Sequence, residues 1–273
     1  MSERHTPEPP GNGHKPSSLV PDLEKMEEGD LAEIRQYVQE DYWEHGKAKG
    51  LSGYDGAYIN WWWVNRWMQC FAQVFPVRDK VILDLGCGYG SVVAGFQTWG
   101  ADAYGIDISD YAVEKGKNLA DYLAERLYQG SVHDLSRWGD ETFDIIYSNQ
   151  VFEHVPERYV TDVIAEAFRV LKPGGLCWFA FVTSTEENGV RGENDQDQSH
   201  INIHNMDWWR RRFFQAGFGE RKDLDDALRN ATTGYDHFSY FQEYGWDSIA
   251  LEKPGDGGVS TDSRVTQIDP RKG

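Results

Sequence analysis

Three aspartates, each within or just after a short apolar run, have a spacing that suits binding of one charged, hydroxyl-bearing ligand. Asp84 lies in the run 81–85, two residues before the glycine-rich turn 86–90. Asp107 ends a second run about twenty residues after that turn, which is typical of a carboxylate that accepts hydrogen bonds from both hydroxyls of a ribose. Asp134 follows a third run, and its carboxylate can accept a hydrogen bond from the exocyclic amine of an adenine.

The glycine turn indicates what kind of ligand approaches. Glycines at the tip of a strand let a ligand reach backbone that a Cβ would shield. A dinucleotide would place its pyrophosphate at the N-terminus of the next helix, where Asp84 would repel it. Ser91 also stands where the dinucleotide fingerprint has glycine or alanine. S-adenosylmethionine carries an ammonium and a sulfonium group and no phosphate, so the pattern favours it as the cofactor.

Apolar strands and helical segments alternate from residue 81 onward, which predicts an α/β fold with a doubly wound, mostly parallel sheet. We expect helices over residues 90–98, 111–124 and 160–171, and strands over residues 81–85, 103–107, 143–150, 176–182, 219–224 and 247–252.

These motifs, in this order and at this spacing, resemble the class I S-adenosylmethionine-dependent methyltransferases over about residues 80–253. The resemblance implies a Rossmann-like sheet of seven strands, the last one antiparallel. It also implies these cofactor contacts: Gly86 and Gly88 at the methionine end, Asp84 at its amino group, Asp107 at the ribose, Ile108 on the adenine, Asp134 and Leu135 at the adenine edge, and Asn149 beside the methionine. Two structural alternatives stay open, because Asp134 also suits a helix N-cap and Asn149 a turn.

Composition divides the chain into five parts. Residues 1–20 and 254–273 are rich in proline, glycine and polar side chains, so we expect disordered tails. Residues 21–78 are predicted to form a helical cap, and residues 79–253 the cofactor-binding methyltransferase domain. The polar insertion 184–200 follows a strand tip, where long loops often act as lids.

The tryptophan-rich segment 58–75 is predicted to be a helix that caps the carboxyl ends of the strands, where the cofactor lies. In the resembling family, a tyrosine from this front region often covers the cofactor, which points to Tyr54 or Tyr58. We expect the acceptor site to be roofed by this helix and by the lid 184–200.

Methyl transfer to a hydroxyl requires removal of its proton, typically by a histidine. His154 follows the fourth strand, and related sugar methyltransferases use a histidine at a similar position as the base. A packed or capping role is the alternative for His154, and His200 is a second candidate base behind the lid. The run 197–202, followed by a tryptophan-containing helix, resembles a subgroup that modifies sugars and natural-product precursors. We therefore predict O-methylation of a sugar-containing or aromatic metabolite, with His204 as a further substrate contact.

Metal binding is not predicted. Asp195, Asp197, His200 and His204 have suitable side chains, but loop carboxylates at this spacing are common in solvated loops. Metal-dependent catechol-type methyltransferases also place an acid at the fourth strand tip, where this chain has Asn149.

Net charge limits the choice of partners. Acidic residues outnumber basic ones by 45 to 27, giving a formal net charge of −18, which disfavours nucleic acid and anionic membranes. The sequence shows no signal peptide and no apolar run of about 18 residues. Three cysteines in packed segments fit a reduced, cytoplasmic protein. We expect a small-molecule acceptor as the partner and make no prediction of oligomeric state.

Other functions compete with O-methyl transfer. The chain could methylate a nitrogen or a carboxylate, or it could bind S-adenosylmethionine without catalysis. A nicotinamide oxidoreductase is opposed by Asp84 and Ser91. The intact acids and glycines of the turn argue against loss of cofactor binding.

Overall fold

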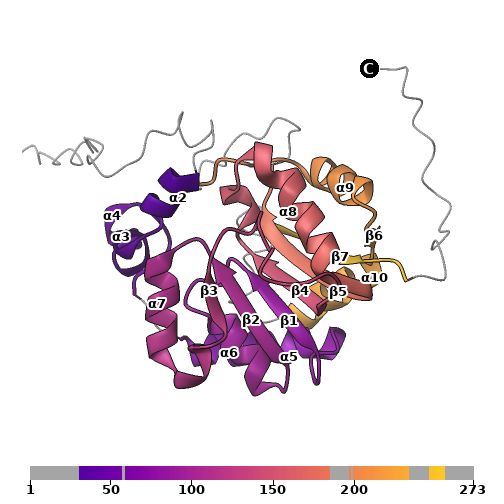
Figure 1. The fold of residues 1–273 in the computed structure, drawn as a ribbon, viewed down its shortest axis with the longest axis horizontal. Coiled ribbons are helices and arrows are strands. Elements are labelled where there is room, and N and C mark those ends of the chain that lie inside the picture. The colour runs from indigo at the N-terminus through magenta and orange to yellow at the C-terminus, as the bar shows by residue number, and fades with distance from the viewer. Residues whose placement is uncertain (1–30, 57–58, 185–196, 198, 234–245, 256–273) are drawn as a thin grey trace, which may run out of the picture.

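A seven-stranded sheet organises the chain in the computed structural model, which describes residues 31–56, 59–184, 197, 199–233 and 246–255 (Figure 1). The strand order is β3-β2-β1-β4-β5-β7-β6. The strands are β1 (Val81–Leu85), β2 (Asp102–Asp107), β3 (Leu127–Gln129), β4 (Phe143–Asn149), β5 (Leu171–Val182), β6 (Gly219–Glu220) and β7 (Trp246–Glu252).

Strand direction confirms the predicted fold class. Strands β1 to β5 pair in parallel, and β7 runs antiparallel to both β5 and β6. Leu85, the last residue of β1, pairs with Ile106 of β2 and with Ser148 of β4. The ends of these three strands are therefore level, so the residues that leave them meet at one edge of the sheet.

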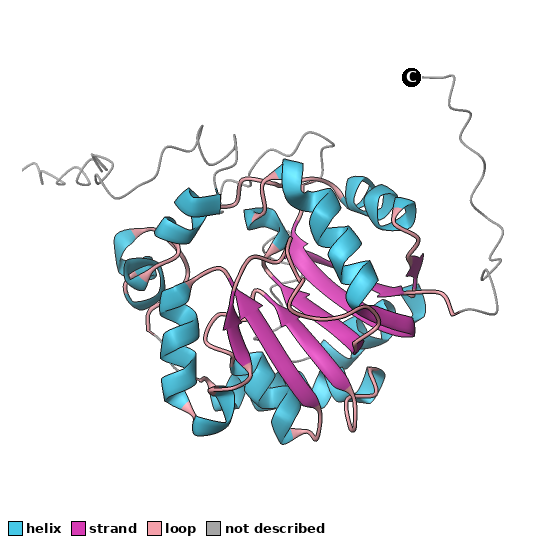
Figure 2. Cartoon of the chain, viewed as in Figure 1, coloured by secondary structure: helices cyan, strands magenta, loops and turns pink. Residues whose placement is uncertain are grey.

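Helices cover both faces of the sheet (Figure 2). Alternate strand residues face opposite ways, so Ile82 packs with one set of helices and Leu83 with the other. The first set is α5 (Trp61–Val74), α6 (Ser91–Thr98) and α10 (Lys222–Thr232); the second is α8 (Glu157–Val170) and α9 (Met206–Gln215). None of the described helices is long and apolar enough to cross a membrane.

Helix α5 does not cap the strand tips, which corrects the prediction made from its tryptophans. It packs flat on the sheet, where the Trp67 ring lies 5.1 Å from the Trp178 ring and 6.3 Å from the Tyr147 ring, centroid to centroid. Its apolar stripe matches the apolar faces of β4 and β5. The sequence pattern predicts this stripe, but it does not say which apolar surface the stripe covers.

The strand tips are covered instead by residues 31–56, which we call the front segment. It contains α2 (Leu31–Tyr37), α3 (Glu40–Glu44) and α4 (Gly46–Lys49). Its buried side chains pack against the segment that joins β1 to α6 and against α7 (Asp110–Leu119); they are Ile34, Tyr37, Val38, Tyr42, Trp43 and Leu51.

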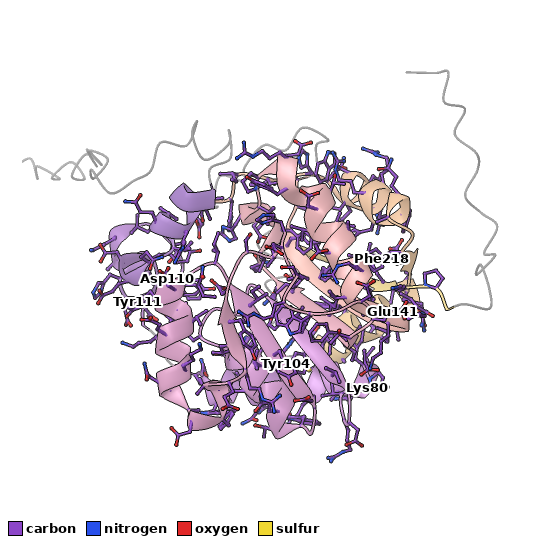
Figure 3. The ribbon with its side chains drawn as sticks, in the orientation of Figure 1. Lys80, Tyr104, Asp110, Tyr111, Glu141 and Phe218 are labelled. Carbon is purple, nitrogen blue, oxygen red and sulfur yellow. The ribbon has the colours of Figure 1, made fainter. Side chains whose placement is uncertain are left out.

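Polar contacts fix the front segment to the start of α7, where Asp110 and Tyr111 lie beside it (Figure 3). The Arg35 guanidinium donates to both carboxylate oxygens of Asp110, at 3.1 and 2.7 Å. The Tyr111 hydroxyl donates to the Glu44 carboxylate at 2.5 Å. Exposed ion pairs alone contribute little to stability, so the buried apolar contacts hold the segment in place and these bonds set its orientation.

Several further predictions can be compared with the structure. The predicted strand 219–224 is shorter, because α10 begins at Lys222 and acidic side chains in its first turn favour a helix. The predicted disordered tails lie outside the described residues, except for Pro254 and Gly255. Most of the predicted lid also lies outside them.

Candidate active site

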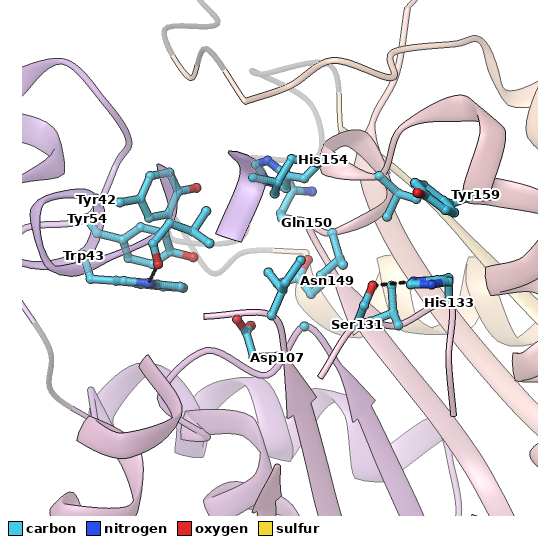
Figure 4. Close-up of a pocket in the computed structure, with 17 residues that line it drawn as sticks. Tyr42, Trp43, Tyr54, Asp107, Ser131, His133, Asn149, Gln150, His154 and Tyr159 are labelled. Atoms are coloured by element: carbon cyan, nitrogen blue, oxygen red, sulfur yellow. Dashed lines mark hydrogen bonds between the residues drawn. The ribbon is translucent and has the colours of Figure 1, made fainter. Parts of the chain in front are cut away.

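The carboxyl ends of β1, β2 and β4 open into a pocket under the front segment that encloses about 750 Å³, part of it open to solvent (Figure 4). The lining comes from the front segment (Ile34, Val38, Tyr42, Trp43, Tyr54), from the ends of β1 and β2 (Gly86, Asp107, Ile108), from the segment after β3 (Ser131, Val132, His133), and from the end of β4 onward (Asn149, Gln150, Val151, His154, Val155, Tyr159).

The glycine turn after β1 needs its glycines. Gly86 has φ of +72°, and a Cβ there would lie 2.2 Å from a methyl carbon of Val151. Gly88 has φ of +51°, and a Cβ there would lie 3.1 Å from the Trp43 ring. Both positions combine a left-handed backbone with close packing, so the turn brings bare backbone to the pocket.

Asp107 ends β2 in the pocket wall, as predicted for a ribose-binding acid. Its Oδ2 accepts a hydrogen bond from Gly88 N–H and its Oδ1 one from Ser109 N–H, both at 2.8 Å. Burial raises the pKa of Asp107, and these two bonds partly offset the rise. The carboxylate is therefore fixed in direction, and each oxygen keeps a second lone pair for a ligand hydroxyl.

Asp84 lies deeper than predicted. Its side chain is only 3% exposed, and it is not among the residues that line the pocket. Burial, and then the negative charge of Asp107, raise its pKa well above the usual range. A positive ligand group nearby would offset both effects, and contact of Asp84 with the cofactor amine stays a prediction.

Two of the predicted adenine contacts, Asp134 and Leu135, are not among the residues that line the pocket. Asp134 is exposed, and its carboxylate accepts a hydrogen bond from Ser136 N–H at 3.0 Å in a local turn. Leu135 is fully buried in the core. The pocket is lined by residues 131–133 instead, and the Ser131 hydroxyl lies 2.7 Å from the ring Nδ1 of His133. A search for residues that directly follow the end of β3, rather than for the nearest acidic residue, would have identified residues 131–133.

Aromatic side chains of the front segment form one wall of the pocket, opposite Asn149 and Gln150 in Figure 4. The Trp43 and Tyr54 rings are 4.4 Å apart, and the Tyr42 and Tyr54 rings 5.7 Å apart. Tyr54 lines the pocket, and its predicted contact with the cofactor stays a prediction. Tyr58 lies outside the described residues. Sequence reasoning missed Tyr42 and Trp43, although their place in an amphipathic front segment was a usable signal.

His154 lies in the pocket wall at the end of the short helix η2 (Phe152–His154), directly after β4. Its Nδ1 is 2.8 Å from the Ser199 hydroxyl and 3.2 Å from the Ser199 carbonyl oxygen. Its ring packs edge-on against His200, with centroids 4.7 Å apart. The structure thus brings together the two histidines predicted as candidate bases.

His200 and His204 differ from His154 in their surroundings, since neither lines the pocket. His200 Nε2 lies 4.0 Å from a carboxylate oxygen of Asp197. The His204 ring stacks on Trp208 at 3.6 Å, and its Nε2 is 3.6 Å from a Glu157 carboxylate oxygen. His204 is thus packed away from the pocket, which corrects its prediction as a substrate contact.

Glu153, which the sequence analysis missed, joins the end of β4 to the segment that carries His200. Its backbone carbonyl accepts hydrogen bonds from the N–H groups of Ile201 and Asn202, both at 2.9 Å. Its side chain is fully buried, and Oε2 has no hydrogen-bond partner. Burial raises the pKa of Glu153 to about 7, and the charge of His200 opposes the rise.

One group within the described ranges has the composition and spacing to hold a metal ion. Glu153, His154 and His200 each offer a ligand atom, and these atoms lie within 4.8 Å of one another. Of the loop residues weighed from the sequence, Asp197 and His200 are close together, His204 is packed elsewhere, and Asp195 lies outside the described residues. The absence of a metal remains a prediction.

Comparison of the sequence with known proteins identifies a matching family and several relatives. Residues 83–179 match a family described as a methyltransferase domain. The chain is 31% identical over 123 residues to the ubiquinone biosynthesis O-methyltransferase of Thiobacillus denitrificans, covering 42% of this chain and 48% of that protein. Such matches span between about half and two thirds of the curated relatives' length. The chain carries a class I S-adenosylmethionine-dependent methyltransferase domain.

Solved structures share the fold of this methyltransferase domain. The [4+2]-cyclase SpnF superposes with a TM-score of 0.52 at 19% identity, covering 70% of this chain and 81% of that one. Phosphoethanolamine N-methyltransferase 2 of Haemonchus contortus, in complex with S-adenosylhomocysteine, gives 0.53 at 14% identity, covering 81% and 60%. These likenesses show the fold alone, and their differing names show that the fold does not set the reaction.

The cofactor of the methyltransferase domain is S-adenosylmethionine. Two features of the pocket fit S-adenosylmethionine. Gly86 presents backbone that a side chain would block, and Asp107 presents an oriented carboxylate at a neighbouring strand end. Gln150 adds a buried side-chain nitrogen in the pocket wall that has no hydrogen-bond partner among the described residues.

Proposed function

We propose that the chain is an S-adenosylmethionine-dependent methyltransferase that methylates a hydroxyl group of a small molecule carrying an aromatic or sugar ring. The observation that carries this proposal is the presence of Asp107 and His154 in the walls of one pocket. The first residue suits the cofactor ribose, and the second suits removal of a proton from an acceptor hydroxyl.

The residues that leave the strand ends support one placement of the cofactor. Asp107 accepts hydrogen bonds from the ribose hydroxyls, while Ile108 and Val132 hold the adenine. Gly86 and Asn149 lie at the methionine end. When bound, the cofactor supplies a methyl group activated on a sulfonium. The chain's own residues must then align the acceptor with that methyl, and alignment can lower the barrier by many kcal/mol.

His154 acts as the general base in this proposal. It leaves β4 next to Asn149 and Gln150, so it lies beside the proposed methionine end rather than the adenine end. A hydroxyl becomes a good nucleophile as its proton is removed, and a positioned base contributes typically about a hundred- to ten-thousand-fold. His200 lies behind His154 and acts on it through ring contact, not on the acceptor.

The chemistry of the aromatic wall supports the proposed class of acceptor. Tyr42, Trp43 and Tyr54 present ring faces and edges, which suit an aromatic ring or the apolar face of a sugar. The curated relatives are named ubiquinone biosynthesis O-methyltransferases, which supports a hydroxyl as the acceptor group. We further propose that the front segment is the cap of the site and that α5 belongs with the sheet domain.

The experiment is a methylation screen with the full chain. Phenols, catechols, glycosides, amines and carboxylic acids are incubated with S-adenosylmethionine carrying a deuterated methyl group, and products are detected by mass. We expect the labelled methyl on a hydroxyl of a ring-containing acceptor. Transfer restricted to amines or carboxylates would contradict O-methylation. Full turnover by His154→Ala on the identified acceptor would contradict the role of His154 as the base.

A further inference from the structure

We propose that Tyr42, Asp197 and Ser199 are positioning residues that hold the imidazole of His154 in the tautomer that leaves Nε2 able to accept a proton. The three residues form a chain of hydrogen bonds from the front segment to the proposed base. This inference rests on the proposed function only where it names His154 as a base, because the tautomer itself is a property of the free protein.

The hydrogen-bond chain is continuous and short. The Tyr42 hydroxyl donates to Asp197 Oδ2 at 2.9 Å. The Ser199 hydroxyl donates to Asp197 Oδ1 at 2.5 Å, and Ser199 N–H donates to the same oxygen at 2.9 Å. The Ser199 hydroxyl oxygen lies 2.8 Å from His154 Nδ1. Tyr42 and Asp197 are 155 residues apart, so the chain of bonds ties two distant segments to one ring.

The hydrogen-bonding roles of the neighbouring groups determine which nitrogen of the His154 ring carries the proton. An ionised carboxylate only accepts, so the Ser199 hydroxyl proton goes to Asp197 and its oxygen is left as an acceptor. The Ser199 carbonyl oxygen, 3.2 Å from the same Nδ1, also only accepts. His154 Nδ1 must therefore carry the proton and donate. In the neutral ring, Nε2 is then the bare nitrogen, which is the form a base needs.

Burial makes this arrangement rigid. Tyr42 is 4% exposed, Asp197 9% and Ser199 0%. Asp197 accepts from both side-chain hydroxyls and from a backbone N–H, so its charge is well paired away from water. Hydrogen bonds to a charged acceptor in such surroundings are stronger than neutral ones. Among the described residues, Glu153, Asp197 and His200 are titratable side chains close to the ring, and Asp197 acts on Nδ1 through Ser199.

The front segment joins this arrangement to the cofactor turn. Trp43, the neighbour of Tyr42 on α3, contacts the position of Gly88, and its indole N–H donates to the Ser109 hydroxyl at 3.1 Å. One short helix therefore touches both the turn beside the cofactor and the carboxylate that orients the base. Loosening this helix should weaken cofactor binding and release the ring of His154 together.

The test is nitrogen NMR of the full chain labelled on its histidine imidazoles, at a pH where the rings are neutral. The His154 signals are assigned by comparison with His154→Gln. We expect the Nδ1–H tautomer in the unmodified protein and the appearance of the Nε2–H tautomer in Ser199→Ala. Tyr42→Phe should give partial mixing, whereas Tyr37→Phe should give none, because the Tyr37 hydroxyl bonds to the Leu51 carbonyl instead.

Several outcomes would overturn the proposal. They are an Nε2–H tautomer in the unmodified protein, an unchanged tautomer in folded Ser199→Ala, and equal effects of Tyr42→Phe and Tyr37→Phe. Stoichiometric metal in the purified protein, lost in Glu153→Gln, would also overturn it, because His154 would then be a ligand. If the tautomer is as expected but His154→Ala retains full turnover, the positioning stands and the proposed base fails.

Discussion

Replacing Asp107 by alanine removes a carboxylate that lines the pocket at a strand end. In the structure this carboxylate is oriented by two backbone N–H groups, from Gly88 and Ser109. Its remaining lone pairs are therefore preorganised for the two ribose hydroxyls of the cofactor. The variant loses both contacts, and no other acidic side chain lines this pocket among the described residues.

The size of the effect follows from the kind of bond lost. Hydrogen bonds to a charged group contribute about 1.5–3 kcal/mol each, and water replaces part of this in the variant. We expect a net loss of about 2–3 kcal/mol for both hydroxyls together. At about 1.4 kcal/mol per factor of ten, the dissociation constant of S-adenosylhomocysteine should rise about 30- to 150-fold.

Titration calorimetry with S-adenosylhomocysteine measures this change, and thermal unfolding checks that Asp107→Ala is folded. The matched control is Asp134→Ala, which removes an acid that also follows a strand but lies exposed outside the pocket. The control should bind within about twofold of the unmodified chain, since surface substitutions away from a site have small effects. Equal losses in the two variants, or none in a folded Asp107→Ala, would refute the ribose assignment.

Three other changes test the fold and the buried acid. Burial raises the pKa of Glu153 from 4.5 to about 7. Because the unfolded chain ionises first as the pH rises, the folded protein should lose up to about 3 kcal/mol of stability between those pH values. Glu153→Gln should flatten this pH dependence of the unfolding free energy in chemical denaturation, and an unchanged pH dependence would contradict the account. Gly86→Ala should destabilise the protein by about 2–4 kcal/mol, because alanine is strained in a left-handed conformation and the new methyl meets Val151. The control Gly174→Ala has φ of +74° and open space around it, so it should cost only about 1–2 kcal/mol in the same measurement. Trp67→Ala should destabilise by about 3–5 kcal/mol yet leave the S-adenosylhomocysteine affinity of the folded protein unchanged; a large loss of affinity would restore α5 as the cap.

The parts of the site next to strand ends were predictable from sequence. The apolar runs mark where β1, β2 and β4 end, and parallel strands end at one edge of the sheet. The positions of Gly86, Asp107 and Asn149 in the pocket follow from this. Asp134 is not among the pocket-lining residues, because β3 spans only Leu127–Gln129 and the pocket is reached directly after it, at residues 131–133.

The rest of the site depends on contacts that have no local pattern. The stripe of α5 predicts burial, but nothing in its period distinguishes a sheet face from the strand tips. The bond between Tyr42 and Asp197 joins distant segments, and neither residue stands in a recognisable motif with the other. The sequence analysis did not single out Glu153, and its burial becomes visible only when the segment after residue 199 is placed over it.

A crystal structure of the full chain with S-adenosylhomocysteine tests the central claim most directly. The account predicts the ribose hydroxyls on the Asp107 carboxylate, the adenine against Ile108 and Val132, and the sulfur on the side of the pocket that contains His154. Density for the ligand outside this pocket, or with its adenine and methionine ends exchanged, would contradict both the cofactor placement and the choice of His154 as the base.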